Sequence, residues 1–390
     1  MILDYPDVLI DCFRDTDLGE IDTVAVSRAP GIIEILGNHT DYNGGLVLTS
    51  TIDQFVWTMG IPSDVTILYS VDYDEKIIFE PGTVQRESTE LHWSDYVRGL
   101  YWSFHRRRHD VRGLAGVIYG DIPQRKGLGS SAALEISLVN IISHISNLEI
   151  LPKSKAMLAY EAERLFCGIS CGVMDQFTSQ LSKPDSLLGI HCANMITQNI
   201  PIPENISFIV VNSMVNQAQD NALNERKGEC LDALSTLQEA DWNIHNLSAI
   251  TPSDLQLLPE TLDEGLVKRV THVVEENQRV REGIAVLQNN NPEALGKIMI
   301  GSHNSSRDLF EVSHPNLEIL MNIAKAQEGI LGCRLTGEGF GGNILLLSKE
   351  NQVKNIISNI TQEYERETGL IPESAICAIP GGVVVEDVSI

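Results

Sequence analysis

Short hydrophobic runs alternate with turn residues through the first eighty positions of the chain. Phe55–Met59 and Val65–Tyr69 are rich in β-branched and aromatic residues, and Gly, Pro and Asp separate such runs. This pattern is typical of strands joined by turns. We therefore expect a β-sheet from Ile21 to about Phe79, followed by a helix over Trp93–His105.

A strand, a glycine-rich loop and a helix are predicted next. Gly116–Gly120 is a short apolar run that enters the loop 121–129. Beyond this loop apolar residues return every three or four positions, which predicts a helix over Ser130–Ile145. These positions are Leu134, Leu138, Ile141, Ile142 and Ile145. Further helices are expected over Lys153–Phe166 and from near Val173.

The second half of the chain is predicted to contain long helices followed by strands. Ile206–Asn212 is an apolar run after Pro201 and Pro203, and we place a domain boundary there. A chain of 390 residues exceeds what one hydrophobic core usually organises, so we predict two α+β domains, residues 1–205 and 206–390. Beyond the boundary, the expected helices cover residues 221–238, 266–288 and 314–327, and the expected strands cover 333–335 and 343–347.

The charge balance argues against polyanionic partners. The chain has 53 acidic and 28 basic residues, a formal net charge of −25, which opposes attraction to nucleic acid or to an anionic membrane. The one dense basic run, Arg106–His109, is short and is typical of a solvated helix end. A nucleotide site in such a chain needs local positive potential from backbone amides, a metal ion or a few lysines.

Cysteine usage and the amino-terminal residues indicate a cytoplasmic location. The seven cysteines are scattered, and Cys167 and Cys171 are the only close pair, which favours reduced thiols over disulfides or a zinc site. No basic stretch followed by an apolar run opens the chain, so no secretory signal is expected. No uninterrupted apolar run is long enough to span a bilayer.

The loop before the predicted helix at Ser130 is a candidate phosphate site. Amides at a helix amino terminus lack intrahelical partners and carry partial positive charge, so an anion can bind there. The candidate residues are Gly127, Leu128, Gly129, Ser130, Ser131 and Ala132. An ordinary capped turn is the alternative. The chain has no Gly-x-x-x-x-Gly-Lys-Ser/Thr sequence and no protein-kinase motif set, so any ATP site uses another loop.

Three motifs in order resemble those of the galactokinases and of the wider GHMP kinase superfamily. They are Ala29–Gly45 (APGIIEILGNHTDYNGG), Gly127–Ala132 (GLGSSA) and Thr336–Gly342 (TGEGFGG). Three other stretches, 93–99, 171–177 and 306–315, are similar to galactokinases specifically. The resemblance implies a two-domain GHMP kinase fold, with an S5-like amino-terminal domain, a ferredoxin-like carboxyl-terminal domain and an active site in the cleft between them. It also implies transfer of the γ-phosphoryl of ATP to the anomeric hydroxyl of galactose or a related sugar, with Mg²⁺.

The resemblance also assigns roles to individual residues. Asp175 is the expected catalytic aspartate, which orients the acceptor hydroxyl and takes its proton; an ordinary acidic residue in a first helical turn is the alternative. Ser131 and Glu163 are the expected Mg²⁺ ligands, with a solvated helix carboxylate as the alternative for Glu163. The sugar contacts implied are Asn38, His39, Asp41, Gly172, Asp175 and Leu223; for Asp41, capping of an Asx turn is the alternative.

The chain departs from the family's pattern at several of these positions. The family's arginine after Ala-Pro-Gly is Ile32 here, which removes a cation expected near the transferred phosphoryl group. Our hypothesis is that Lys126 or Arg125, which directly precede the loop, replaces this cation, and Arg28 and Arg226 are further candidates. The glutamate of the sugar motif is Asn38, and a pocket tyrosine aligns with Leu223.

These departures leave other functions open. A neutral Asn38 makes an acidic sugar, a uronic acid, conceivable as the acceptor. The loss of the arginine also leaves open a catalytically silent sugar and ATP sensor, although the retained Asp175, Glu163 and Ser131 favour an enzyme. A third possibility is a GHMP kinase for a different small alcohol. The sequence does not specify the oligomeric state.

Overall fold

The computed structural model describes residues 5–16, 21–82, 84–86, 88–124, 126–215 and 221–390. The chain forms two compact units. Unit 1 contains Met1–Ile32, Thr51–Pro184 and Pro380–Ile390, and unit 2 contains Ile33–Ser50 and Asp185–Ile379. Two long strands, β1 (Thr23–Leu36) and β2 (Leu46–Ser63), contribute residues to both units.

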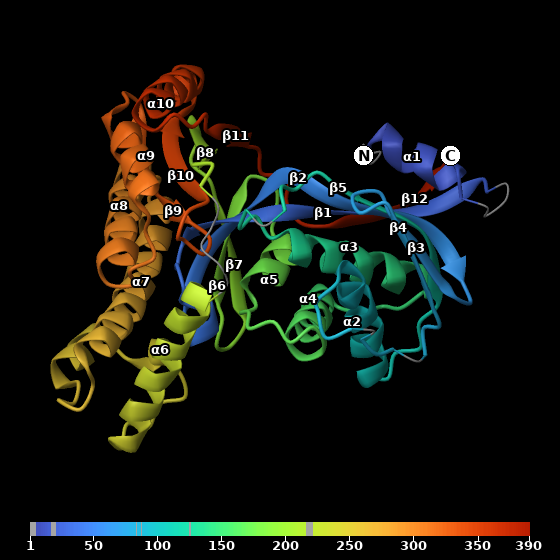
Figure 1. Ribbon diagram of the computed structural model, residues 1–390, viewed down its shortest axis with the longest axis horizontal. Helices are drawn as coiled ribbons and strands as arrows, with labels where there is room; N and C mark the ends of the chain where they lie inside the picture. The colour runs from blue at the N-terminus through green and yellow to red at the C-terminus, as the bar shows by residue number, and fades with distance from the viewer. Residues whose placement is uncertain (1–4, 17–20, 83, 87, 125, 216–220) are drawn as a thin grey trace. The chain divides into compact units, whose positions relative to one another are not determined.

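Unit 1 is built on a mixed sheet with strand order β12-β1-β2-β5-β3-β4 (Figure 1). The strands β3 and β5 pair in parallel, whereas β12 with β1, β2 with β5, and β3 with β4 are antiparallel. The shorter strands are β3 (Thr66–Ser70), β4 (Glu75–Phe79), β5 (Gly113–Gly120) and β12 (Val384–Ser389). The carboxyl-terminal strand therefore completes the sheet that the amino-terminal region begins.

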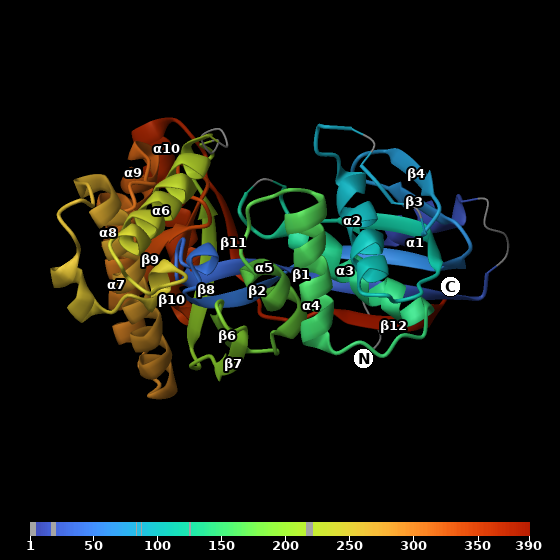
Figure 2. The ribbon, with the colours of Figure 1, turned by 90° about the horizontal axis from the view of Figure 1, so that it is seen from below.

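Helices cover both faces of this sheet. Four lie on one side (Figures 1 and 2), namely α2 (Trp93–Arg106), α3 (Ser130–Ile145), α4 (Pro152–Glu161) and α5 (Met174–Leu181). A π-helical turn, Ala162–Phe166, continues directly from α4. On the other side, α1 (Asp7–Arg14) packs Leu9 and Phe13 into a cluster with Val24, Trp57 and Val117. This cluster packs α1 against strands β1, β2 and β5 of the sheet.

Unit 2 contains an antiparallel sheet with strand order β11-β8-β10-β9. Its strands are β8 (Ile206–Asn212), β9 (Ile330–Thr336), β10 (Asn343–Lys349) and β11 (Glu373–Cys377). Its helices are α6 (Asn221–Glu239), α7 (Glu264–Gln288), α8 (Pro292–Asp308), α9 (Pro315–Ala326) and α10 (Val353–Thr368), with 3-10 turns at Leu247–Ala249, Pro252–Leu257 and Glu350–Gln352. A hairpin of β6 (Ser186–His191) and β7 (Ile196–Pro201) pairs with residues 46–49 of β2.

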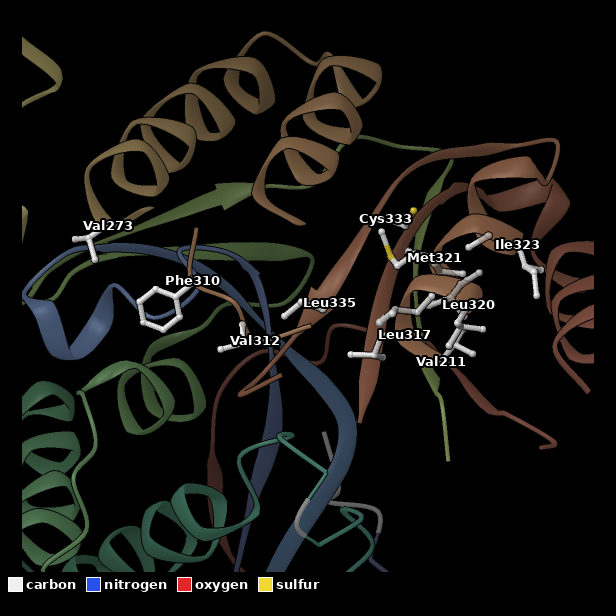
Figure 3. Packing of buried hydrophobic residues seen from close by; sticks show 14 of the residues in the cluster. Val211, Val273, Phe310, Val312, Leu317, Leu320, Met321, Ile323, Cys333 and Leu335 are labelled. Carbon is white, nitrogen blue, oxygen red and sulfur yellow. The ribbon is translucent and has the colours of Figure 1, made fainter. Parts of the chain in front are cut away.

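The core of unit 2 forms where helices pack on this sheet. Leu317, Leu320 and Met321 of α9 belong to one cluster with Val211 of β8 and Leu335 of β9 (Figure 3). All five side chains are fully buried, and burial of a side chain of this size contributes about 1.5–3 kcal/mol. The apolar positions of β8 and β9 thus pack against α9.

Several predicted elements are confirmed, and others differ in extent. The structure has α3 and β8 at the predicted bounds. The strands β1 and β2 are 14 and 18 residues long, far longer than the short strands predicted, because both extend through two compact units. The helix predicted over Lys153–Phe166 is α4 followed by the π-helical turn. Within the described residues, no helix combines the length and apolarity that a membrane crossing requires.

The close packing of α8 against β9 gives a test of this core. A Cβ added to Gly296 of α8 would lie 2.0 Å from the carbonyl oxygen of Leu331 in β9, whereas one added to Gly301 meets only Arg279 Cδ at 3.7 Å. We expect Gly296→Ala to lower the free energy of unfolding by about 1–3 kcal/mol, because overpacking forces the helix away from the strand. Gly301→Ala is the control and should be neutral or stabilising. Equal urea denaturation midpoints for both variants would contradict this packing.

Candidate active site

The loop before α3 leads into a helix whose N-cap residue is a glycine. Gly127 and Gly129 both have φ of 68°, a backbone conformation that glycine adopts without strain. Gly129 is the N-cap of α3 and provides no capping side chain. The first helical hydrogen bond runs from the amide of Ala133 to the carbonyl of Gly129 at 2.9 Å. The amides of residues 130–132 precede this bond, so they are oriented to bind an anion.

Strand β1 holds this loop in place. The amide of Ile32 donates to the carbonyl of Leu128 at 2.9 Å. The Ile32 side chain is buried, and a Cβ added to Gly129 would lie 2.7 Å from its Cγ1. Residue 32, where the family has arginine, is therefore an apolar support for the loop.

Asp175 lies beside the same loop, in the first turn of α5. A Cβ added to Gly129 would lie 3.7 Å from Asp175 Oδ2. The buried Phe177 and the hydrogen bond from the Ser179 hydroxyl to the Pro30 carbonyl, 2.8 Å long, anchor α5 on the sheet side. The structure thus brings a carboxylate next to the helix terminus that the sequence marks as a phosphate site.

A buried carboxylate network adjoins the loop. The Ser131 hydroxyl donates to Glu163 Oε1 at 3.0 Å, and Glu163 lies in the π-helical turn. The Gln176 amide donates to Glu135 Oε2 at 3.2 Å and to Glu163 Oε2. Burial, and then the neighbouring Glu163 carboxylate, raises the pKa of Glu135 well above its usual range. The raised pKa favours the neutral form of Glu135, which limits the negative charge of the network.

The sugar signature lies in unit 2, where Asn38 is engaged by protein groups. Its Oδ1 accepts from the Ser306 hydroxyl at 2.9 Å, and its Nδ2 donates to the Gly337 carbonyl at 2.9 Å and to Glu34 Oε2 at 3.5 Å. Glu34 in turn forms a buried ion pair with Arg334 at 2.9 Å. Asn38 therefore ties the signature to the glycine-rich third motif.

His39 and Tyr42 each carry a buried polar atom without a hydrogen-bond partner among the described residues. These atoms are His39 Nε2 and Tyr42 Oη, and the two ring centroids are 6.0 Å apart. His39 stacks on Phe310 at 4.5 Å, and burial lowers its pKa well below the usual value. An imidazole that stays neutral at pH 7 keeps one accepting nitrogen, so a ligand hydroxyl can satisfy both orphaned atoms.

The other predicted sugar contacts, Asp41, Leu223 and Gly172, lie in three different segments of the two units. Asp41 begins a 3-10 turn, Asp41–Asn43, in unit 2. Leu223 lies in α6 and is buried, with 9% of its surface exposed. Gly172 belongs to unit 1 and lies just before α5.

The cations that are candidates to replace the family's arginine differ in their settings. Lys126 directly precedes Gly127 and is half-buried, whereas Arg125 lies outside the described residues. Arg28 lies over the Phe55 ring at 4.4 Å. In unit 2, Arg226 pairs with Glu229 at 2.8 Å. Arg28 and Arg226 thus already have protein partners.

Three residues of these networks were not singled out from the sequence. They are Glu135, Gln176 and Tyr42. Gln176 and Tyr42 lie within quoted motifs, next to Asp175 and Asp41, so membership of a motif was the signal, although it indicated no role for either side chain. Glu135 is the one acidic residue of α3 and is buried, and an unpaired buried charge is unfavourable enough to indicate a polar partner.

Family models match three segments of the chain. The GHMP kinases N terminal domain matches residues 95–183, the GHMP kinases C terminal matches residues 284–366, and the galactokinase galactose-binding signature matches residues 13–70. The Methanococcus jannaschii mevalonate kinase structure covers 91% of this chain and 98% of its own, with a TM-score of 0.64 and 19% identity, and shares the fold. The fold and the loop before α3 therefore define a GHMP kinase.

Whole-chain relatives narrow this class. Galactokinases of Roseiflexus sp. (strain RS-1) and Haemophilus influenzae are 32% and 34% identical over 92% of this chain, and over 92% and 94% of their own length. The structure of Lactococcus lactis galactokinase complexed with galactose has a TM-score of 0.89 and 27% identity, with 97% of each chain covered. The chain belongs to the galactokinase family.

The crowding at Gly129 gives a test of the loop geometry. We expect Gly129→Ala to lower kcat/KM for ATP by at least about tenfold, because a Cβ there meets Ile32 and shifts the amides of α3. Gly369→Ala is the matched control: Gly369 has φ of 73°, close to the 68° of Gly129, but a Cβ added there meets no atom within 4 Å. Steady-state kinetics that show equal losses in both variants would contradict a specific role of the loop.

Proposed function

We propose that this protein transfers the γ-phosphoryl group of ATP to the anomeric hydroxyl of galactose. The observation that carries this proposal is the amino terminus of α3, with Gly129 as its N-cap, beside Asp175: the Cβ position of Gly129 lies 3.7 Å from Asp175 Oδ2. Phosphoryl transfer depends on positioning and charge neutralisation more than on covalent chemistry. A phosphate-binding helix terminus next to one carboxylate suits that reaction.

The loop is proposed to bind the phosphates of ATP. The backbone amides that point out of the start of α3 supply partial positive charge in a chain whose net charge is −25. The residues proposed to contact ATP are Gly127, Leu128, Gly129, Ser130, Ser131 and Ala132.

Ser131 and Glu163 are proposed to hold Mg²⁺. A hydroxyl and a carboxylate only 3.0 Å apart are hard oxygen ligands of the kind that this ion prefers. The described residues contain no cluster of three or more His, Cys, Asp or Glu suited to a metal, which fits an ion bound through few protein ligands and substrate phosphates. Mg²⁺ bound there neutralises charge on the phosphate oxygens.

Asp175 is proposed to act as the base. The anomeric oxygen forms a bond to the γ-phosphorus while the bond from that phosphorus to the β–γ bridging oxygen breaks, and ADP leaves. The hydroxyl proton passes to Asp175 and then to water. An enzyme is favoured over a silent sensor, because the base and both Mg²⁺ ligands are retained around one loop.

The galactose hydroxyls are proposed to bind at the signature. His39 Nε2 and Tyr42 Oη are buried and have no hydrogen-bond partner in the part of the chain that the structure describes, and bound hydroxyls would pair with both atoms. Asp41, Asn38, Gly172 and Leu223 are proposed to complete the site. Because the polar atoms of Asn38 bind Ser306, Gly337 and Glu34, its neutrality gives no reason to expect an acidic sugar.

The remaining assignments are also proposals. We propose domain limits of 1–205 and 206–390. These limits place the two matched segments, 95–183 and 284–366, in separate domains. All seven cysteines are free thiols, which suits a reducing compartment, and a cytoplasmic location is proposed on that ground.

Phosphorus NMR after incubation with ATP, Mg²⁺ and single sugars tests the function. We expect an anomeric sugar phosphate and ADP in equal amounts with galactose, and no product when either ATP or Mg²⁺ is omitted. Glucose and galacturonic acid are the comparison acceptors. Faster conversion of either one, or ADP formation without sugar phosphate, would contradict the proposal.

Variants at the loop test which cation replaces the family's arginine. If Lys126 or Arg125 supplies that charge, Lys126→Ala or Arg125→Ala should lower kcat by about 10²-fold, with little change in the KM for galactose. Arg28→Ala is the control, since Arg28 lies over the Phe55 ring. Undiminished turnover in both loop variants would exclude the hypothesis.

A further inference from the structure

We propose that Gln176 is a positioning residue, whose amide orients the Mg²⁺-binding carboxylate of Glu163 by bridging it to Glu135. The inference rests on the proposed function, because it takes Glu163 as a Mg²⁺ ligand. It assigns a purpose to two buried polar residues, Gln176 and Glu135, that the proposed reaction does not otherwise use.

The bridge depends on both hydrogens of one amide. Gln176 Nε2 donates to Glu135 Oε2 at 3.2 Å and to Glu163 Oε2. With Oε2 of Glu163 held by the amide, its Oε1 faces the Ser131 hydroxyl at 3.0 Å. The carboxylate therefore presents one defined edge to the other proposed ligand.

Burial makes this arrangement stiff. Gln176 and Glu135 have no exposed surface, and Glu163 has 6%. An interaction of a charged carboxylate with an amide is stronger in such surroundings than in water. Rotation of the Glu163 carboxylate would break the bridge and leave a buried amide hydrogen unpaired, which is unfavourable.

The backbone around the bridge holds its two ends in defined positions. Glu163 lies in the π-helical turn, closed by a hydrogen bond from the Cys167 amide to the Ala162 carbonyl at 3.0 Å. Such turns interrupt regular helix geometry and often occur at functional sites. Gln176 directly follows Asp175 in α5, so the residue that orients the metal ligand is fixed to the backbone of the proposed base. The bridge thus fixes the position of the Glu163 carboxylate relative to Asp175.

The Cys171 thiol also contacts this carboxylate, through a side-chain hydrogen bond to Glu163. The Gln176 amide differs from the thiol because it also donates to Glu135. It therefore links the Glu163 carboxylate to a second buried side chain.

Gln176→Met tests this role, because methionine keeps the length of the side chain and removes the amide. Gln180→Met is the matched control on the same helix, where the amide oxygen accepts from Asn140 Nδ2 at 2.7 Å. Two quantities are measured for each protein: the Mg²⁺ concentration that gives half-maximal galactose phosphorylation, and the calorimetric affinity for ADP with Mg²⁺ and with EDTA.

We expect Gln176→Met to raise the half-saturating Mg²⁺ concentration by about 10–100-fold, the usual effect of removing a residue that orients a metal ligand. ADP affinity in EDTA should stay within about twofold of the wild type, since the loop amides are untouched. Gln180→Met should leave the Mg²⁺ dependence unchanged. If Gln176→Met does not fold, Gln176→Asn, whose amide is one methylene too short to reach both carboxylates, is measured in its place and should shift the Mg²⁺ dependence in the same direction.

An unchanged Mg²⁺ dependence in the Gln176 variant would overturn the inference. So would a loss of ADP affinity in EDTA as large as the loss with Mg²⁺, because that result indicates general damage to the fold. A wild-type protein that does not phosphorylate galactose would instead overturn the proposed function, which keeps the two failures distinct.

Discussion

The proposed chemistry depends on the close approach of a helix amino terminus and a carboxylate. The amides of α3 attract a phosphate, and the Asp175 carboxylate, 3.7 Å from the Cβ position of Gly129, repels one. A phosphate can bind between the α3 amides and Asp175 only when further positive charge neutralises it there. The apolar Ile32 beside Gly129 sharpens this requirement, because it takes the place of the cation that the family has there. We propose that Mg²⁺ held by Ser131 and Glu163, together with Lys126 or Arg125, supplies this positive charge.

Unit 2 shows how a departure from the family's pattern can be accommodated locally. The signature glutamate is replaced by Asn38, and Glu34 Oε2 lies 3.5 Å from the Asn38 amide. A glutamate at position 38 would therefore put a second carboxylate beside that of Glu34, where Arg334 is the buried ion-pair partner. Two buried carboxylates at this distance cannot both stay charged without cost. The neutral Asn38 thus avoids charge repulsion with Glu34 and leaves its ion pair with Arg334 intact.

Local pattern was enough to predict some elements and not others. The helix α3 was predictable because Leu134, Leu138 and Ile141 mark one apolar face, and the order of the three motifs implied the fold. The π-helical turn at Ala162–Phe166 was not, since its residues continue the spacing of α4. The role of Gln176 was hidden as well, because its partners Glu135 and Glu163 are 41 and 13 positions away in the chain. Contacts that tertiary packing creates leave little local signal.

A crystal structure with galactose, Mg²⁺ and a non-hydrolysable ATP analogue tests the central claim most directly. The distances to measure run from the γ-phosphate oxygens to the amides of residues 130–132, and from the anomeric oxygen to the Asp175 carboxylate. We predict that both sets lie near about 3 Å, the reach of a hydrogen bond. Phosphates bound away from the start of α3, or an anomeric oxygen that faces another group, would contradict the account.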